Sequence, residues 1–336
     1  MERPDRRGQR VKRSTTAAAL VASSMVGAAA FSASRQLSRF HATPDPDPLP
    51  PLRRPDGDRR TVVTDDGARL ATIASGDDPS APVIVLGHGW TSDLRSWQLV
   101  HDPLVTAGYR VVTWDQRGHG ESTVGTSGFG VDQLGADLAA VLEQLDLRGA
   151  VVAGHSMGGV GVQSLALGHR DLVAERVRGF VLVATLGRSV KTIPVAPLRR
   201  LLQSDLYDRR RDQPSAIATL MHLRAFGPGV RPSVVERNTE VFLDCPTSTV
   251  IGAIEPLVDF DLTDQLHTIT TPTLVVTADV DRVTPTGRSR ELHQLLPDAR
   301  IHSFAGVGHM IPLERPTELV GLIESFAGEL GLAAAA

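Results

Sequence analysis

The sequence predicts an α/β fold, in which a mostly parallel β-sheet is flanked by helices and carries a helical cap insertion. Three observations support this class. Short apolar runs rich in valine and isoleucine, such as residues 82–86, are typical of strands buried on both faces. These runs alternate with stretches of helical periodicity, as expected for a parallel sheet with crossover helices. Residues 187–265 interrupt the alternation, because they contain no strand signal.

The expected elements follow the chain in order. A hairpin signal at Asp65-Asp66-Gly67 separates the first two strands. Leucine and valine recur at helical spacing between residues 134 and 145. The expected strands are residues 61–64, 69–74, 82–86, 110–114, 150–153, 180–184, 273–277 and 300–304. The expected helices are residues 94–107, 134–145, 157–168 and 311–330.

Charge is unevenly distributed along the chain. The 336 residues carry a net charge of −3, yet residues 1–40 contain eight lysines or arginines and two acidic residues, a net charge of +6. The remainder therefore carries −9. An acidic body without a basic stripe argues against nucleic acid as a partner. The single cysteine, Cys245, can form no intramolecular disulfide and no cysteine-based metal site.

Residues 1–40 are predicted to be a basic leader. Residues 14–34 contain no charged residue, and a helix of that length could just cross the hydrocarbon core of a bilayer. Basic residues precede this stretch and favour export of the body. We therefore expect a membrane anchor or signal peptide, and a membrane-anchored or exported protein. A disordered alanine-rich leader on a cytoplasmic protein is the alternative, because alanine, serine and threonine dominate the segment.

The remaining boundaries follow from proline. Residues 41–58 are so rich in proline that we expect an extended, stiff linker there. Residues 59–336 then form the folded domain, with residues 187–265 as a cap over the site. Within that cap, Pro214, Pro232 and Pro246 each precede a helix-compatible stretch. The sequence carries no signal for the oligomeric state.

The strongest chemical signal is Gly-His-Ser-Met-Gly-Gly at residues 154–159, which lies between an expected strand and an expected helix. Glycine two residues on either side of Ser156 permits a tight strand-to-helix turn that exposes the serine hydroxyl. That turn lies at the carboxyl edge of the sheet, where ligands bind in such folds. Ser156 is therefore the candidate nucleophile.

From about residue 60 to 330, the chain resembles the α/β-hydrolase family, with a helical cap as in esterases and lipases. Leu-Gly-His-Gly-Trp at residues 86–90 resembles the oxyanion loop of that family. The resemblance implies an oxyanion hole formed by the backbone N–H groups of Trp90 and Met157. Residues 114–122 resemble a further family signature, whose role is mainly structural, and we assign no catalysis to Asp115 or His119.

A serine hydroxyl needs a base, and context identifies one of the 11 histidines. His309 follows the last expected strand and opens the last helix, as the catalytic histidine of the family does. Two acids, Asp279 and Asp281, follow the expected strand at residues 273–277. The family pattern Gly-x-x-Asp-x-x-x-Pro matches at Asp281, although Thr277 replaces its glycine. The resemblance favours Asp281 as the acid that orients His309, with Asp279 as the alternative.

These residues predict a serine hydrolase that cleaves a carboxylic ester through an acyl-enzyme on Ser156. The same triad would serve a haloperoxidase or perhydrolase, a carbon–carbon bond hydrolase, a thioesterase or an acyltransferase. A non-catalytic binding protein on this scaffold is a third hypothesis. The expected partner is a small-molecule or lipid ester, with membrane association through residues 14–34. Apolar cap residues would either line an acyl-chain pocket or pack the cap onto the body: Ile217, Leu220, Met221, Leu223 and Phe226. No metal or organic cofactor is implied.

Overall fold

The computed structural model describes residues 35, 37–190, 196, 199–200 and 222–334. Its centre is an eight-stranded sheet with the order β1-β2-β4-β3-β5-β6-β7-β8. The first two strands pair antiparallel with each other, β2 pairs antiparallel with β4, and the other neighbours are all parallel. The expected mostly parallel α/β sheet is therefore confirmed.

The strands lie close to their predicted positions. β3, β5 and β7 are buried along their whole length, as their valine-rich sequences predict. The eight strands are β1 (Asp58–Val63), β2 (Arg69–Ser75), β3 (Val83–Gly87), β4 (Arg110–Trp114), β5 (Ala150–His155), β6 (Val177–Val183), β7 (Thr273–Ala278) and β8 (Ala299–Phe304).

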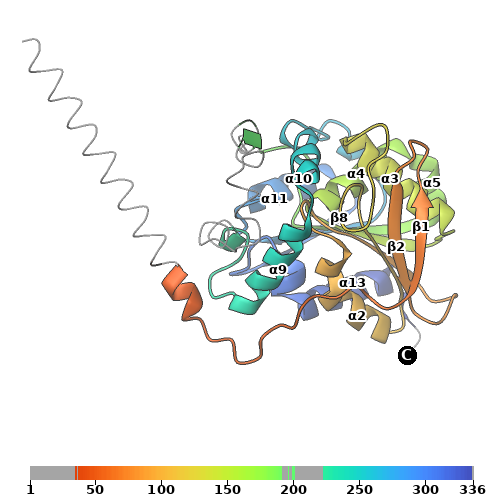
Figure 1. Ribbon diagram of the computed structural model, residues 1–336. Coiled ribbons are helices and arrows are strands. Elements are labelled where there is room, and N and C mark those ends of the chain that lie inside the picture. The colour runs from red at the N-terminus through yellow and green to blue at the C-terminus, as the bar shows by residue number, and fades with distance from the viewer. Residues whose placement is uncertain (1–34, 36, 191–195, 197–198, 201–221, 335–336) are drawn as a thin grey trace, which may run out of the picture.

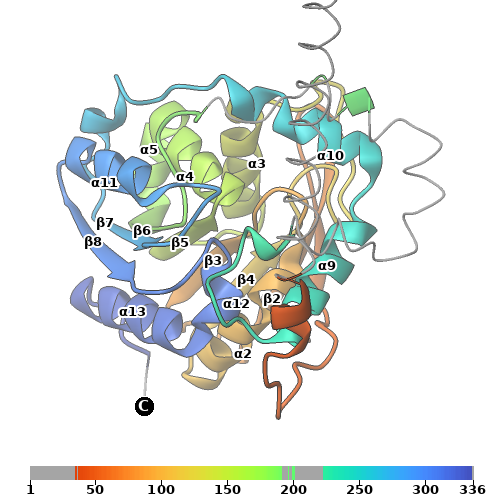
Figure 2. The ribbon, with the colours of Figure 1, turned by 90° about the vertical axis from the view of Figure 1, so that its left-hand side faces the viewer.

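Helices cover both faces of the sheet (Figures 1 and 2). One face packs against a hydrophobic core shared with α3 (Val131–Gln144), α4 (Met157–Gly168), α5 (Arg170–Arg176) and α11 (Thr286–Leu295). The other packs against α2 (Gln98–Thr106) and α13 (Pro316–Glu329). The sheet is therefore buried from both sides, and polar side chains at the ends of its parallel strands are left to form a site.

Several helix predictions need correction. Residues 311–330 form two helices, α12 (Ile311–Glu314) and α13, because the residue before a proline disfavours helical geometry. Arg315, which precedes Pro316, has φ −138° and ψ 52°. Residues 94–107 likewise divide into the 3₁₀-helix η1 (Leu94–Trp97) and α2. Neither α5 nor α11 was predicted from the sequence.

The described part of the predicted cap is helical. It contains α9 (Pro232–Asp244), α10 (Thr247–Ile254) and the 3₁₀-helix η2 (Pro256–Val258). Pro232 occupies the first helical position, as expected, and Pro246 is the N-cap of α10. A further 3₁₀-helix, η3 (Leu266–Thr268), leads back to β7. Pro214, Ile217, Leu220 and Met221 lie outside the described residues.

The proline-rich segment lies against the body. Residues 42–57 form neither helix nor strand, and Leu49 and Leu52 are each only 8% exposed. The Leu49 N–H donates to Ser233 of α9 at 2.8 Å, and the Arg53 N–H donates to Gln98 of α2 at 2.7 Å. The segment therefore bridges the cap and one helical layer of the body, and Figure 1 shows it running past α9.

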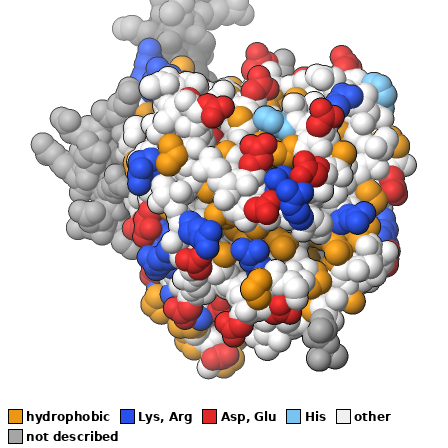
Figure 3. Space-filling model, turned by 90° about the vertical axis from the view of Figure 1, so that its right-hand side faces the viewer, with side chains coloured by type: hydrophobic (Ala, Val, Ile, Leu, Met, Phe, Trp, Pro, Cys, Tyr) orange, Lys and Arg blue, Asp and Glu red, His pale blue; other side chains and the backbone are white. Residues whose placement is uncertain are grey.

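The predicted anchor at residues 14–34 lies outside the described residues. Among the described residues, no single helix is long and apolar enough to cross a membrane. Taken together, α9 and the helical segment Thr247–Val258 have the required length and composition, but the two are bent by 93° relative to each other. Acidic and basic side chains are interspersed on the face of the molecule that Figure 3 shows.

Candidate active site

Ser156 occupies a strained turn between β5 and α4. Its backbone has φ 53° and ψ −115°, and its N–H donates to the carbonyl of Val183 in the neighbouring strand at 2.9 Å. Such a backbone conformation costs a non-glycine residue about 1–3 kcal/mol. Glycine is required nearby, because a Cβ on Gly158 would lie 2.4 Å from the carbonyl oxygen of Gly87 in β3. The close packing of α4 on the sheet therefore holds Ser156 in this turn.

Asp281 and His309 are brought together as a buried pair. Asp281 Oδ2 lies 2.9 Å from His309 Nδ1, and the two side chains are 0% and 7% exposed. Asp281 Oδ1 accepts the backbone N–H groups of Val283 and Thr284, both at 2.8 Å. Oδ2 can then accept a hydrogen bond from the Nδ1–H of His309, which leaves Nε2 as the unprotonated, basic nitrogen of the ring.

Two opposing effects set the pKa of Asp281. Burial alone would raise it, but the charge of His309 and hydrogen bonds from His309 and Thr284 hold the pKa below its ordinary value. Asp281 is therefore ionised at neutral pH. An ionised carboxylate at this position can stabilise an imidazolium on His309.

Asp279, the alternative acid, has a different role. It is exposed, and its Oδ1 accepts the N–H of Gly306 at 2.7 Å. Asp279 therefore joins the loop after β7 to the loop after β8. Of the two acids that the sequence proposed, Asp281 is the one that contacts His309.

The backbone around His309 is held by the cap and by α12. The His309 N–H donates to the carbonyl of Ala225 at 2.6 Å, and Glu314 accepts the N–H groups of Gly308 and Gly227. Burial raises the pKa of Glu314, against the effect of these two hydrogen bonds. The cap therefore positions the candidate base directly, through main-chain contacts.

His155 connects the Ser156 turn to the His309 loop. Its Nε2 lies 3.0 Å from the carbonyl oxygen of His309, and the two ring centroids are 4.8 Å apart. No hydrogen bond joins the Ser156 hydroxyl to the His309 ring within the described part of the chain. Hydrogen bonds between nucleophile and base are often long before substrate binds and tighten in the complex.

Trp90 and Met157, the two candidate oxyanion-hole residues, lie in the loop after β3 and at the start of α4. Met157 begins α4 and is buried, while the Trp90 indole donates to the carbonyl of Val250 in α10 at 3.0 Å. Neither backbone N–H donates a hydrogen bond to another described residue. A Cβ on Gly89 would lie 3.3 Å from Cβ of Ser156, so the loop before Trp90 closely approaches the serine.

Burial keeps three histidines near the site neutral. It lowers the pKa of His88 to about 4 and that of His119 to about 3. Burial and the nearby charge of His309 lower the pKa of His155 to about 3. His88 accepts the N–H of Gln116 at 2.9 Å and His119 accepts that of Thr91 at 3.3 Å. His88 and His119 therefore each connect two loops through these hydrogen bonds.

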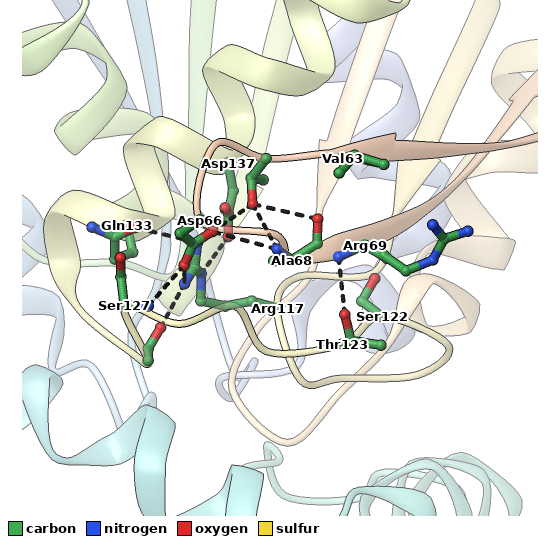
Figure 4. Close-up of polar contacts among 12 residues, drawn as sticks. Val63, Asp66, Ala68, Arg69, Arg117, Ser122, Thr123, Ser127, Gln133 and Asp137 are labelled. Atoms are coloured by element: carbon green, nitrogen blue, oxygen red, sulfur yellow. Dashed lines mark hydrogen bonds and ion pairs between the residues drawn. The ribbon is translucent and has the colours of Figure 1, made fainter.

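The signature at residues 114–122 is held by buried ion pairs. Arg117, only 1% exposed, pairs with Asp137 of α3 at 2.6 Å and with Asp66 of the β1–β2 turn at 3.1 Å (Figure 4). Asp115 is fully buried and pairs with Arg54 of the proline-rich segment at 2.8 Å. Burial raises the pKa of Asp115, against the charge of Arg54. These contacts stabilise the loop and reach no candidate catalytic atom.

Thr284 was not among the site residues predicted from the sequence. Its hydroxyl lies 2.6 Å from Asp281 Oδ2 and 3.2 Å from His309 Nδ1, so it touches both members of the pair. The local signal was an Asp followed three residues later by Thr, which is typical of a turn that the Asp side chain caps. Among the described residues, no three His, Cys, Asp or Glu side chains form a group that could hold a metal ion.

A family model described as alpha/beta hydrolase fold matches residues 82–316 of this chain. Non-heme chloroperoxidase of Burkholderia pyrrocinia is 28% identical over 279 residues, which cover 74% of this chain and 92% of that protein. A bifunctional esterase/perhydrolase of Acinetobacter calcoaceticus is 28% identical over 245 residues, which cover 69% and 86%.

A similar solved structure is that of a thermophilic esterase from Thermogutta terrifontis, which was determined with malate bound. Its TM-score is 0.68 at 26% sequence identity, and the match covers 82% of this chain and 99% of the esterase chain.

Proposed function

The chain belongs to the α/β-hydrolase fold family, and on this basis we propose that it is a serine hydrolase that cleaves carboxylic esters. The observation that carries the proposal is the buried Asp281–His309 pair, whose loop contacts the strained, glycine-flanked Ser156 turn through His155. A serine hydroxyl becomes nucleophilic only when a positioned base removes its proton. Esterases and haloperoxidases among the relatives support an enzyme of this general class.

In the proposed reaction, the Ser156 oxygen attacks the ester carbonyl while His309 Nε2 takes the hydroxyl proton. Asp281 keeps the other ring nitrogen protonated and stabilises the imidazolium. The N–H groups of Trp90 and Met157 bind the oxyanion, and each such donor is worth about 2.7–4 kcal/mol. His309 then protonates the leaving alcohol. Water, activated by the same ring, releases the acid and restores the Ser156 hydroxyl.

A perhydrolase reaction is the second candidate, because one relative is a bifunctional esterase/perhydrolase and another a non-heme chloroperoxidase. In that reaction hydrogen peroxide replaces water as the acceptor, so that the acyl-enzyme yields a peracid and the free serine. The triad would be the same, and only the acceptor of the acyl group would differ.

Covalent labelling tests the nucleophile. A fluorophosphonate probe should label the full chain at Ser156. The Ser156→Ala variant should show no labelling, and its thermal unfolding temperature should equal that of the wild type. Labelling that persists in this variant would disprove the assignment. A second measurement, product analysis of p-nitrophenyl esters with and without hydrogen peroxide, distinguishes hydrolysis from peracid formation.

The substrate class and the location of the protein are proposals of the same kind. We propose a lipidic ester, because residues 14–34 have the length and the flanking charge of a membrane anchor or signal peptide. A series of p-nitrophenyl esters from acetyl to dodecanoyl tests the acyl chain, and a sharp preference for acetyl would count against it. Fractionation of cells that express the full chain tests the membrane association.

A further inference from the structure

A separate pocket of about 630 Å³ lies where three segments far apart in the sequence meet. One is the helical segment at residues 37–41, which lies beside α9 in Figures 1 and 2. The others are the loop at residues 226–230, which leads to α9, and Arg282 in the loop after β7. Ser156, Trp90 and Met157 do not line it, so it is distinct from the place where Ser156 would react.

The pocket shares its walls with the loops that hold the candidate triad. Arg282 directly follows Asp281, and Phe226 directly follows Ala225, whose carbonyl accepts the His309 N–H. A Cβ on Gly308 would lie 2.4 Å from the carbonyl carbon of Phe226, which shows how closely the two loops pack. A ligand in this pocket would therefore contact segments that also position Asp281 and His309.

The pocket is positively charged. Arg39 and Arg282 both line it, both are exposed, and neither forms an ion pair or side-chain hydrogen bond with another described residue. Arg35 is a third arginine in the lining, and among the described residues that line the pocket none is acidic. Positive charges that share one pocket repel each other, so an anion bound in the pocket would be favourable. The planar guanidinium also suits the two oxygens of a carboxylate.

The same pocket has an apolar lining. Phe40, Leu223 and Phe226 are 6%, 8% and 3% exposed and belong to one hydrophobic cluster, together with Met310 and Leu313 beside the candidate base. Of the two roles expected for Leu223 and Phe226, packing of the cap onto the body agrees with this cluster, whereas the pocket that they line is separate from the expected acyl-chain pocket at Ser156. An apolar lining beneath two unpaired arginines matches a molecule with one anionic end and an alkyl chain.

We propose that this pocket binds a single-chain alkyl carboxylate, with its anionic group between Arg39 and Arg282 and its chain against Phe40, Leu223 and Phe226. Binding here is independent of the ester-hydrolase proposal, because the pocket contains none of the proposed reacting atoms. It also requires the N-terminal segment, which supplies Arg39 and Phe40.

Isothermal titration with decanoate tests the proposal, using the full chain that carries Ser156→Ala so that no turnover interferes. Decanoate should bind at a pH where it is ionised, whereas acetate and neutral 1-decanol should bind at least about tenfold more weakly, since each lacks one half of the recognition. Arg39→Gln and Arg282→Gln should each weaken decanoate binding about tenfold or more. Arg290→Gln removes an exposed arginine of α11 that does not line the pocket, and should leave the affinity unchanged.

Arg39→Gln is the decisive variant, because Arg39 is far in sequence from the loop of Asp281 and its loss should not disturb that loop. Unchanged decanoate affinity in this variant would overturn the proposal, even if Arg282→Gln weakened binding. Binding of 1-decanol as tight as that of decanoate would overturn it as well, because the arginines would then have no role. Thermal unfolding at the wild-type temperature shows that each variant is folded.

Discussion

Replacing Asp281 with Asn tests how the buried pair sets the tautomer of His309. Oδ1 of Asp281 accepts two backbone N–H groups at 2.8 Å, so the amide NH₂ of an asparagine cannot occupy that position. The NH₂ must instead take the place of Oδ2, which lies 2.9 Å from His309 Nδ1. There it would donate to Nδ1, and the ring proton would move to Nε2. His309 would then have no free nitrogen to accept the Ser156 proton.

The expected loss is large. The same exchange in a Ser-His-Asp protease lowers kcat about 10⁴-fold, equivalent to about 5.5 kcal/mol in the activation barrier. We expect a loss of that order in kcat for p-nitrophenyl butyrate and in the rate of fluorophosphonate labelling. The labelling rate needs no knowledge of the natural substrate, so it reports on Ser156 even if the ester is a poor one.

Asp279→Asn is the matched control. Asp279 is two residues away and exposed, and the hydrogen bond that its side chain accepts from the Gly306 N–H at 2.7 Å can be kept by an asparagine carbonyl. This variant should change stability by about 0.5 kcal/mol or less and leave the labelling rate almost unchanged. If Asp279→Asn were the slower variant, or if Asp281→Asn kept kcat within about tenfold of the wild type, the reasoning about the His309 tautomer would be refuted.

Two further predictions concern stability. Burial holds the pKa of His88 at about 4 and that of His119 and His155 at about 3, below the 6.5 of an exposed histidine. Below pH 6.5 the unfolded chain therefore binds more protons than the folded chain. As the pH drops towards 4, the free energy of unfolding should fall by about 1.4 kcal/mol per pH unit for each of these histidines. Urea unfolding at several pH values measures this, and a flat profile would contradict it. In the second prediction, Arg117→Met strands the buried carboxylate of Asp137 and should cost about 3–5 kcal/mol, whereas adding Asp137→Leu should restore most of it. Urea midpoints of both variants decide this, and a cost below about 1 kcal/mol in the single variant would refute it.

Ser156 could be found from the sequence because its signal is local. A valine-rich strand, a glycine-flanked serine and a helix-forming stretch follow one another within residues 150–168, and each depends only on neighbouring residues. Elbow, strand and helix lie where expected, with α4 beginning at Met157. The division of the last helix at Pro316 could also have been predicted from local sequence, because proline disfavours helical geometry in the residue before it. The apolar periodicity of residues 311–330 predicted one continuous helix instead.

The choice between Asp279 and Asp281 depended on more than local sequence. The two residues follow the same strand, and a family pattern that matched without its glycine was the only ground for preferring one. The structure distinguishes them because the backbone turns between them, so that one carboxylate enters the buried space beside His309 while the other stays exposed. Thr284 was missed for the same reason, since its contact with His309 joins two loops.

The sequence by itself determined the strands, the serine turn and the absence of helix and strand from residues 42–57, because each follows from short-range sterics and local apolar patterns. Only the tertiary structure decided where that segment docks, which acid meets His309, and that Arg39 and Arg282 share a pocket. These outcomes depend on contacts between residues far apart in the chain, such as Leu49 with Ser233 and Arg54 with Asp115. No local pattern encodes such pairings, because they exist only after the sheet and the cap have brought the two partners together.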